Sequence, residues 1–191
     1  MASQSPRARQ GKGSGAPKAA AARNTARQDI AVVDAFDFPP CNNTALRRAA
    51  RRLGNLYDDA LESVGLKATQ MGLMAEIARL TVANQGQSPS LQELAARLAI
   101  QISALTHALR PLVRDGLVAV LPDEADGRTK RGALTVAGAK RLEEASACWV
   151  AANQRVEAVL GRDDAAALRT LADRVSSDEF LAAFTDTPLA T

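Results

Sequence analysis

Aromatic residues and cysteines are scarce in this chain of 191 residues, and long apolar runs are missing. Cys41 and Cys148 are too few for a disulfide framework, and their spacing suits no zinc site. No apolar run is long enough to span a bilayer, and no signal-peptide core precedes a cleavage-like site. We therefore expect a cytoplasmic protein without a membrane partner.

The chain also lacks the motifs of an enzyme. His107 is its only histidine, and no paired-acid motif accompanies it. There is no glycine-rich dinucleotide loop, no phosphate-binding P-loop and no cluster of metal ligands in the sequence. We expect no catalytic activity, no metal and no cofactor.

The composition and the first part of the chain favour helices. Hydrophobic residues make up 47% of the sequence and aromatic residues 3%, a balance typical of closely packed helices. From Thr44 on, apolar residues recur every three or four positions and share one helix face. These residues are Leu46, Ala49, Leu53, Leu56 and Ala60. Gly65 stands where a helix end favours a left-handed residue, and a second helix is predicted from about Thr69.

The segment 90–132 contains the most specific pattern. Ser90 and Glu93 fit a capping box, which predicts that a helix begins at Ser90. Another helix is predicted from about Gln101 to Asp115, and Gly116 ends it. Its predicted inward residues are Ile102, Leu105, Leu109 and Leu112.

A hairpin is predicted after this helix pair. Leu117–Leu121 has the unbroken, β-branched character of a short buried strand. The segment 122–132 forms the tip, and Ala133 and Leu134 belong to the returning strand. A helix pair followed by a hairpin with a basic tip suits the grooves of duplex DNA.

The outward residues of the helix 101–115 have side chains that can contact a major groove. Gln can read adenine, Arg can bind guanine or a phosphate, Ser and Thr can contact either, and Ala can touch a thymine methyl. The predicted contact residues are Gln101, Ser103, Ala104, Thr106, His107 and Arg110. An ordinary amphipathic helix with a solvated polar face would have the same sequence pattern. The helix alone therefore does not distinguish a DNA-binding helix from a surface helix.

The hairpin tip favours the DNA interpretation over a solvated charged turn. Arg128 is predicted to enter the narrow minor groove, where the potential is most negative. Lys130 and Arg131 are predicted to contact phosphates. Asp126 is predicted to support this wing, either by holding the loop or by orienting Arg128 through a charge-assisted bond. The predicted partner is double-stranded DNA.

A long helix is predicted from Thr135 to Gly161, because apolar residues recur there with heptad spacing. The residues of this seam are Gly138, Leu142, Ala145, Trp149, Ala152, Val156 and Val159. A narrow seam packs on a neighbouring helix. Asp163 is predicted to cap one more helix, and residues 184–191 are predicted to fray.

From Leu46 to Leu171 the sequence resembles the MarR family of bacterial winged-helix transcriptional regulators. The strongest matches are Leu94-Ala95, Leu112 with Asp115-Gly116-Leu117-Val118, Asp126 with Arg128, and Leu134-Thr135 with Gly138. The resemblance implies a mainly α fold with a small β-hairpin wing (α+β) over residues 41–183. It implies a winged helix-turn-helix lobe at 66–134, between dimerisation helices at 41–65 and 135–183.

The resemblance further implies a homodimer that binds a pseudo-palindromic operator, in the role of a repressor that a small molecule releases. The implied effector pocket lies between the first helix, with Arg47, Arg51 and Tyr57, and the long helix. Tyr57 and Trp149 suit a small aromatic effector, although such residues more often belong to the core. The rival interpretation is a winged-helix protein-interaction module, which would be monomeric.

The chain departs from the family pattern at several positions. Lys67 replaces the usual Thr before the second helix, and Ile102 and His107 stand where Arg is frequent. In relatives that sense organic hydroperoxides, a reactive cysteine lies where this chain has Asn43. Cys41 is two residues earlier, at a helix N-terminus near several Arg residues, so thiol-based redox sensing is an alternative function. Its resolving thiol would be Cys148 of the partner subunit.

The residues 1–40 are predicted to form a disordered basic tail. They are rich in Gly, Ser, Pro, Gln and Ala, and residues 1–27 contain Lys and Arg but no acid. Such a segment cannot bury enough apolar area to offset the conformational entropy lost on ordering. An idle tail, an arm that adds nonspecific DNA affinity, and a transit peptide are the open interpretations. The segment 11–17, rich in Gly and ending in Pro, breaks the amphipathic helix that a transit peptide needs.

Overall fold

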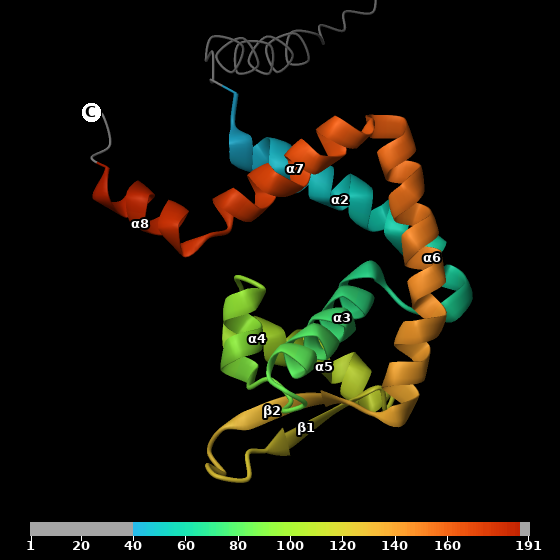
Figure 1. Ribbon diagram of the computed structural model, residues 1–191, viewed down its shortest axis with the longest axis vertical. Coiled ribbons are helices and arrows are strands. Elements are labelled where there is room, and N and C mark those ends of the chain that lie inside the picture. Colours follow the sequence, from blue (N-terminus) through green and yellow to red (C-terminus); the bar gives the residue numbers. More distant parts are fainter. Residues whose placement is uncertain (1–39, 188–191) are drawn as a thin grey trace, which may run out of the picture. The chain divides into compact units, whose positions relative to one another are not determined.

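The computed structural model describes residues 40–187, so the predicted tail lies outside the described residues except for Pro40 (Figure 1). The chain divides into two units, 1–46 and 47–191. The described part of the first unit is residues 40–46, which include the start of α2 (Asn42–Ala60). The second unit contains the rest of α2 and all later elements, and it is mainly helical with one β-hairpin, as predicted.

The first helix offers little to the core of its own chain. Within the described range α2 has no buried residue, and Leu56 is 50% exposed. The short 3-10 helix η1 (Glu62–Val64) follows, and Gly65 ends it with φ of 67°, which confirms the predicted left-handed residue. Leu61 and Leu66, on either side of this turn, are buried.

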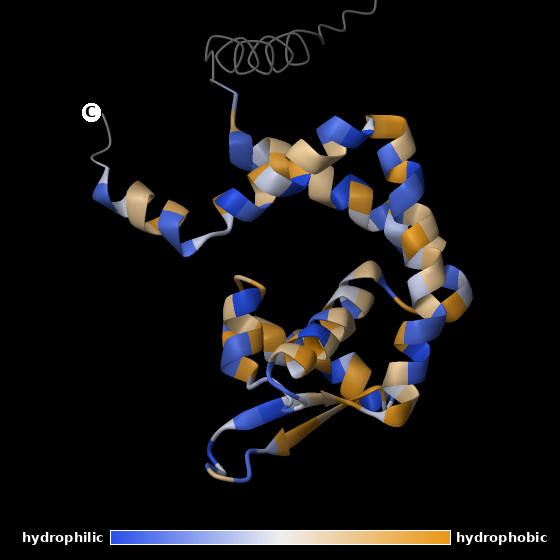
Figure 2. Ribbon diagram, viewed as in Figure 1, coloured by the Kyte–Doolittle hydropathy of each residue, from blue (hydrophilic) through white to orange (hydrophobic). Residues whose placement is uncertain are grey.

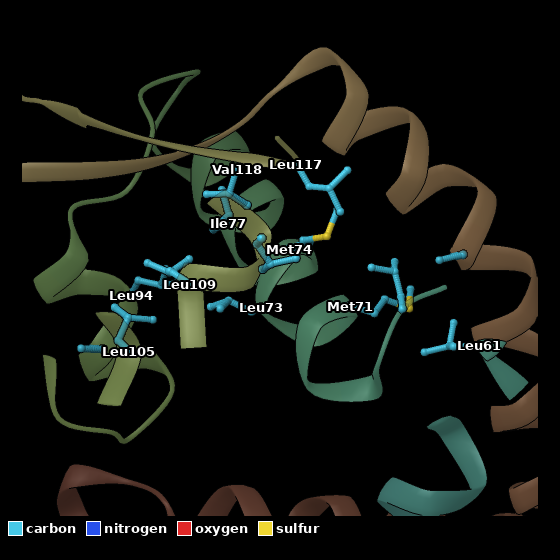
Figure 3. Packing of buried hydrophobic residues seen from close by; sticks show 14 residues of the cluster. Leu61, Met71, Leu73, Met74, Ile77, Leu94, Leu105, Leu109, Leu117 and Val118 are labelled. Carbon is cyan, nitrogen blue, oxygen red and sulfur yellow. The ribbon is translucent and has the colours of Figure 1, made fainter. Parts of the chain in front are cut away.

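The core is built by three short helices, α3 (Ala68–Ala83), α4 (Leu91–Arg97) and α5 (Ile102–Arg114). Figure 3 shows their apolar side chains meeting in one cluster, which also includes Leu117, just before β1, and Val118, the first residue of β1. The helical members of this cluster include Met71, Leu73, Met74, Ile77, Leu94, Leu105, Leu109 and Leu112. Burying one such side chain contributes about 1.5–3 kcal/mol, so this cluster fixes the helix pair to α3.

Local hydrogen bonds set both ends of α4, and its start was predicted. The Ser90 hydroxyl accepts from the Glu93 amide at 3.1 Å, and the Glu93 carboxylate accepts from the Ser90 amide at 2.7 Å. This confirms the capping box. At the other end Ala99 is left-handed, with φ of 51°, and the Ile100 amide donates to the Ala95 carbonyl at 3.0 Å. That bond turns the chain directly into α5.

The hairpin is longer and less buried than the sequence predicted. It consists of β1 (Val118–Pro122) and β2 (Lys130–Leu134), antiparallel, with Val118 opposite Leu134. The expected fully buried strand is wrong: Val118 is 2% exposed, whereas Leu121 is 52% exposed. The reason is that the outer half of the hairpin extends past the core. Figure 2 shows an apolar β1 beside a β2 that is hydrophilic at its outer end.

The long helix α6 (Val136–Leu160) begins at Thr135, as predicted, because the Thr135 hydroxyl accepts from the Gly138 amide at 2.9 Å. The heptad seam is buried only in its first half. Gly138 and Ala145 are buried, whereas Val159 is 84% exposed. The second half of the seam therefore has an apolar face that its own chain leaves uncovered.

Two helices follow, α7 (Arg162–Val175) and α8 (Asp178–Asp186). The predicted cap Asp163 is wrong: Gly161 is the N-cap, and Asp163 lies in the first turn, where its charge favours the helix dipole. The fraying predicted for residues 184–191 stays a prediction: α8 extends to Asp186, and residues 188–191 lie outside the described residues. Ser177 begins α8 by accepting from the Phe180 amide at 3.1 Å, a cap signal that the sequence contained. No helix in residues 40–187 is long and apolar enough to cross a membrane.

Candidate nucleic-acid interface

The exposed face of α5 carries most of the predicted contact residues. Ser103, His107, Arg110 and Arg114 are exposed and follow the spacing of one helix face. Gln101 is the N-cap residue, but its side chain makes no cap hydrogen bond and is exposed. Ala104 and Thr106 are exposed on either side of this face.

One predicted inward residue of this helix is not buried. Ile102 is 46% exposed, whereas Leu105, Leu109 and Leu112 are buried as expected. Ile102 is the first residue of α5, and burial of the helix in the core begins only at Leu105. The apolar spacing was therefore right and the interpretation of its first member was wrong.

A groove of about 800 Å³ separates α5 from the hairpin. It is lined by Ser90, Leu91, Gln92, Ile102, Thr106, Leu109, Arg110, Val113, Arg114, Val120, Asp126, Arg128, Thr129 and Lys130. Among residues 40–187 no acid forms an ion pair with Arg110, Arg128 or Lys130. Arg114 is bonded to Asp115, with Nε and Oδ1 2.8 Å apart. The groove thus has apolar residues beside three cations that form no ion pair within that range, and the acid in its lining, Asp126, is hydrogen-bonded within the wing tip.

The wing tip is shaped by Asp126. Its Oδ1 accepts from the Arg128 amide at 3.0 Å, and its Oδ2 accepts from the Thr129 hydroxyl at 3.0 Å. Of the two predicted roles, Asp126 has the first: it holds the loop through the backbone. The guanidinium of Arg128 makes no hydrogen bond within the described range, and the residue is exposed.

Arg131 has a different place from the one predicted. Its Nε is hydrogen-bonded to the Asp123 carboxylate, its Nη1 donates to the Ser88 carbonyl at 2.6 Å, and its side chain is only 21% exposed. The neighbouring Gly132 amide donates to the Pro89 carbonyl at 3.0 Å. These bonds fasten the hairpin to the loop before α4. We therefore assign Arg131 to the support of the wing and not to contact with phosphates.

Asp123 organises the other side of the tip. Its hydrogen bond from Arg131 holds the pKa of this carboxyl below its ordinary value, and the amides of Asp126 and Ala125, each 2.9 Å from Oδ1, act in the same direction. A lowered pKa means that the folded hairpin prefers the charged carboxylate.

This pKa predicts an acid-sensitive wing. The charged Asp123 carboxylate stabilises the folded hairpin fully at a pH above the ordinary pKa of an Asp carboxyl. This stabilisation is lost as the pH falls from that ordinary pKa through the lowered pKa of Asp123. We expect the amides of Ala125 and Asp126 to lose protection from hydrogen exchange over that range, and the Asp123→Asn variant to lack this pH dependence. A carboxyl of Asp123 that titrates by NMR at its ordinary pKa would contradict the assignment.

A buried carboxylate that the sequence analysis missed fixes the helix pair. Glu76 on α3 is 7% exposed and forms ion pairs with Arg79 and with Arg97 at the end of α4. The Arg97 Nε lies 3.1 Å from the Glu76 carboxylate. An acid beside the apolar residues Met74 and Ile77 was the available signal. The ion pair between Glu76 and Arg97 holds the end of α4 against α3.

Lys67 is part of a substitute for the usual helix cap. The Asp58 carboxylate of α2 accepts from the Ala68 amide at 2.7 Å, and the Lys67 ammonium lies 3.5 Å from the same carboxylate. Asp58 therefore caps α3 in place of a Thr at position 67. A second hollow of about 300 Å³ lies beside this helix end and includes His107, on the flank of α5 opposite the hairpin.

The residues of the predicted effector pocket are only partly brought together. The rings of Tyr57 and Trp149 are in contact, with centroids 4.4 Å apart and planes tilted by 42°, and the Tyr57 hydroxyl donates to Asn153 at 3.0 Å. Burial, followed by the nearby charge of Glu157, raises the pKa of Tyr57. Arg47 and Arg51 are exposed, and neither hollow described above includes them or Tyr57. The effector pocket stays a prediction.

The cysteines stay untested as redox groups. Cys41 is exposed, and hydrogen bonds with the side chain and then the amide of Thr44 lower the pKa of its thiol. Cys148 is half-buried, with Sγ 3.9 Å from the Ser63 hydroxyl. No group of three or more potential metal ligands occurs in the part of the chain that the structure describes.

The chain resembles known proteins over much of this region. The model of the MarR family matches residues 74–130. The transcriptional activatory protein BadR of Rhodopseudomonas palustris is 34% identical over 93 residues, 49% of this chain and 51% of that protein. The chain thus matches about half the length of this curated relative.

Solved structures cover more of the chain. The M. tuberculosis transcriptional regulator MosR, crystallised in complex with DNA, is 37% identical with a TM-score of 0.58, over 70% of this chain and 97% of MosR. A mutant of E. coli MarR complexed with operator DNA is 24% identical with a TM-score of 0.60, over 70% and 91% of the two chains. The second likeness shows the fold alone: a mainly helical chain with a two-stranded antiparallel hairpin, which matches winged-helix structures of MarR type.

Proposed function

The chain belongs to the MarR family of transcriptional regulators, and from this premise we propose that it binds duplex DNA as a homodimer through α5 and the β1–β2 hairpin. The observation that carries the proposal is the groove between these elements. Arg110, Arg128 and Lys130 line it without an acid partner among residues 40–187. Cations without an ion-pair partner, beside an exposed helix face, attract the phosphates of DNA.

Each element has a separate role in this proposal. The residues of α5, with Gln101, Ser103, Ala104, Thr106, His107 and Arg110, enter a major groove. Lys130 contacts a phosphate, and Arg128 at the wing tip enters the adjacent minor groove. In a symmetric dimer the two copies of α5 meet successive major grooves about 34 Å apart, so the operator is pseudo-palindromic.

We further infer that the protein is a repressor and that a small aromatic effector releases it. An effector can do so only if it binds better to a dimer geometry that does not fit DNA. The proposed site lies at Tyr57, whose tilted ring contact with Trp149 joins α2 to α6. Arg47 and Arg51 lie on the same helix and could bind an anionic group of the effector.

The proposal is tested by selecting duplexes from a random-sequence pool with the purified protein. We expect enrichment of an inverted repeat, protection of two major grooves in footprinting, and an affinity that falls steeply with salt. A protein that enriches no sequence, even at low ionic strength, would refute the proposal. A single, asymmetric half-site would leave DNA binding in place and remove the dimer.

Arg128 gives the sharpest test of the wing. The Arg128→Ala variant should bind the selected duplex more weakly by roughly 1–3 kcal/mol, because a desolvated contact in the minor groove is lost. Arg155→Ala is the matched control: it removes the same charge from an exposed position on α6 and should leave the affinity nearly unchanged. Equal effects of the two substitutions in a gel-shift titration would show that only net charge matters.

A further inference from the structure

The flank of α5 that faces the hairpin is apolar. Ile102 is 46% and Val113 42% exposed, and both line the groove together with Thr106. The spacing of these three residues along α5 places them on one side of the row formed by Ser103, His107 and Arg110. Exposed branched side chains at this place need a reason, because the core does not use them.

Thr106 adds to the apolar character of this flank. Its hydroxyl donates to the Ile102 carbonyl at 2.8 Å. The donor is therefore used within the helix, and the side chain can offer a base only its methyl group and an acceptor oxygen. Near the start of α5, this flank consequently presents methyl groups without a free hydrogen-bond donor.

We propose that Ile102, with the methyl group of Thr106, contacts the 5-methyl group of a thymine and so specifies a T·A pair in each half-site. This inference rests on the proposed function. The cations Arg110, Arg128 and Lys130 of the same groove select a polyanion as the occupant. In a major groove the thymine methyl is the apolar group that distinguishes one base from the others.

The position of Ile102 favours base contact over backbone contact. It is the first residue of α5, and the N-terminal residues of a recognition helix are those that reach base edges. An exposed isoleucine cannot bind a phosphate, and contact with a methyl group removes apolar surface of both partners from water. Val113, in the last turn of the helix, lies farther from the bases in this arrangement.

The experiment uses the full-length protein and the duplex that it selects from a random-sequence pool. Each thymine is replaced in turn by deoxyuridine, which removes the 5-methyl group and keeps base pairing. We expect one thymine per half-site at which the replacement weakens binding about fourfold, the effect of losing burial of one methyl group. Replacement in both half-sites should weaken binding about fifteenfold.

A variant identifies the protein side of this contact. Ile102→Ala should bind the thymine duplex more weakly and should no longer distinguish thymine from deoxyuridine at that position. Val82→Ala is the control, because Val82 is 80% exposed on α3 and does not line the groove; it should keep the full fourfold difference. Circular dichroism should show the same helix content for both variants.

The outcomes separate this inference from the proposed function. If the wild type binds its selected duplex but tolerates deoxyuridine at every thymine, the inference is overturned and DNA binding stands. If Ile102→Ala keeps the fourfold difference, another group reads the methyl and the inference is also overturned. A wild type that enriches no duplex overturns both proposals.

Discussion

Replacing Gly138 by alanine should lower the free energy of unfolding by about 3 kcal/mol or more, because no room exists for a side chain there. A Cβ atom at this position would lie 1.9 Å from the Leu117 carbonyl oxygen and 2.8 Å from the Leu117 carbonyl carbon. Both are backbone atoms, so the conflict cannot be relieved by a change of rotamer. The first turn of α6 and the start of β1 would have to separate.

The separation would break a set of hydrogen bonds. The Thr135 amide donates to the Leu117 carbonyl at 3.1 Å, and the Thr135 hydroxyl donates to the Gly116 carbonyl at 2.7 Å. The same hydroxyl accepts from the Gly138 amide and caps α6. Since these bonds fix where α6 leaves the DNA-binding lobe, Gly138→Ala should weaken operator binding as well as folding.

Gly72→Ala is the matched control for this substitution. Gly72 also lies inside a helix, α3, but nothing lies within 4 Å of an added Cβ atom. Alanine should therefore stabilise α3 by about 0.5–1 kcal/mol through its better helix propensity. Urea unfolding at equal protein concentration measures both variants, and equal stabilities for Gly138→Ala and the wild type would contradict the close approach.

The sequence predicted those features that neighbouring residues determine. The capping box at Ser90, the left-handed Gly65 and the cap at Thr135 each depend on three or four successive residues, and all occur in the structure. The missed cap at Ser177 was of the same kind. Asp163 was misplaced by two residues, because Gly161 and Asp163 are both plausible starts for a helix and only the backbone distinguishes them.

Other errors arose because periodicity does not say where a core ends. Ile102 fits the apolar spacing of α5, and Leu121 fits that of β1, yet both are about half exposed. Ile102 is the first residue of α5 and Leu121 the last but one of β1, so both lie where their elements leave the core. The same exposure gives Ile102 its proposed contact with thymine.

Contacts between distant residues could not be predicted from one sequence. Arg131 looked like a free cation of the wing until its partners Asp123 and Ser88 were known. The cap of α3 was missed for the same reason. The Asp58 carboxylate on α2 accepts from the Ala68 amide, and a cap supplied by another helix leaves no pattern in the residues next to the helix start. The sequence therefore predicted which side chains of α5 are exposed more reliably than which cations of the hairpin are free of an ion pair.

The C-terminal helices expose more apolar surface than one chain can use. Leu171 on α7 is 58% exposed, and Leu181 and Phe184 on α8 are 64% and 62% exposed. Val159, near the end of α6, is 84% exposed. Exposed apolar side chains on all three of the last helices favour an association site, and the proposed homodimer supplies an identical partner.

The double variant Leu181→Asp/Phe184→Asp should therefore convert a dimer of twice 20.1 kDa into a monomer of 20.1 kDa in light scattering. Both side chains are more than 60% exposed, so the fold of one chain does not depend on them. Burying a carboxylate without a partner in an interface costs several kcal/mol, which is enough to separate the subunits. The helix content should stay unchanged.

Loss of the dimer should nearly abolish operator binding. A monomer presents one copy of α5 and one wing, so it loses the second half-site and with it about a hundredfold or more in affinity. Val82→Asp is the control, because it places the same charge at an 80% exposed valine on α3, outside the C-terminal helices. It should stay dimeric and bind DNA normally. If the double variant remains dimeric, the dimer interface lies on surfaces other than α8. If the variant is a monomer and still binds the full operator as tightly as the wild type, each DNA-binding lobe recognises DNA alone.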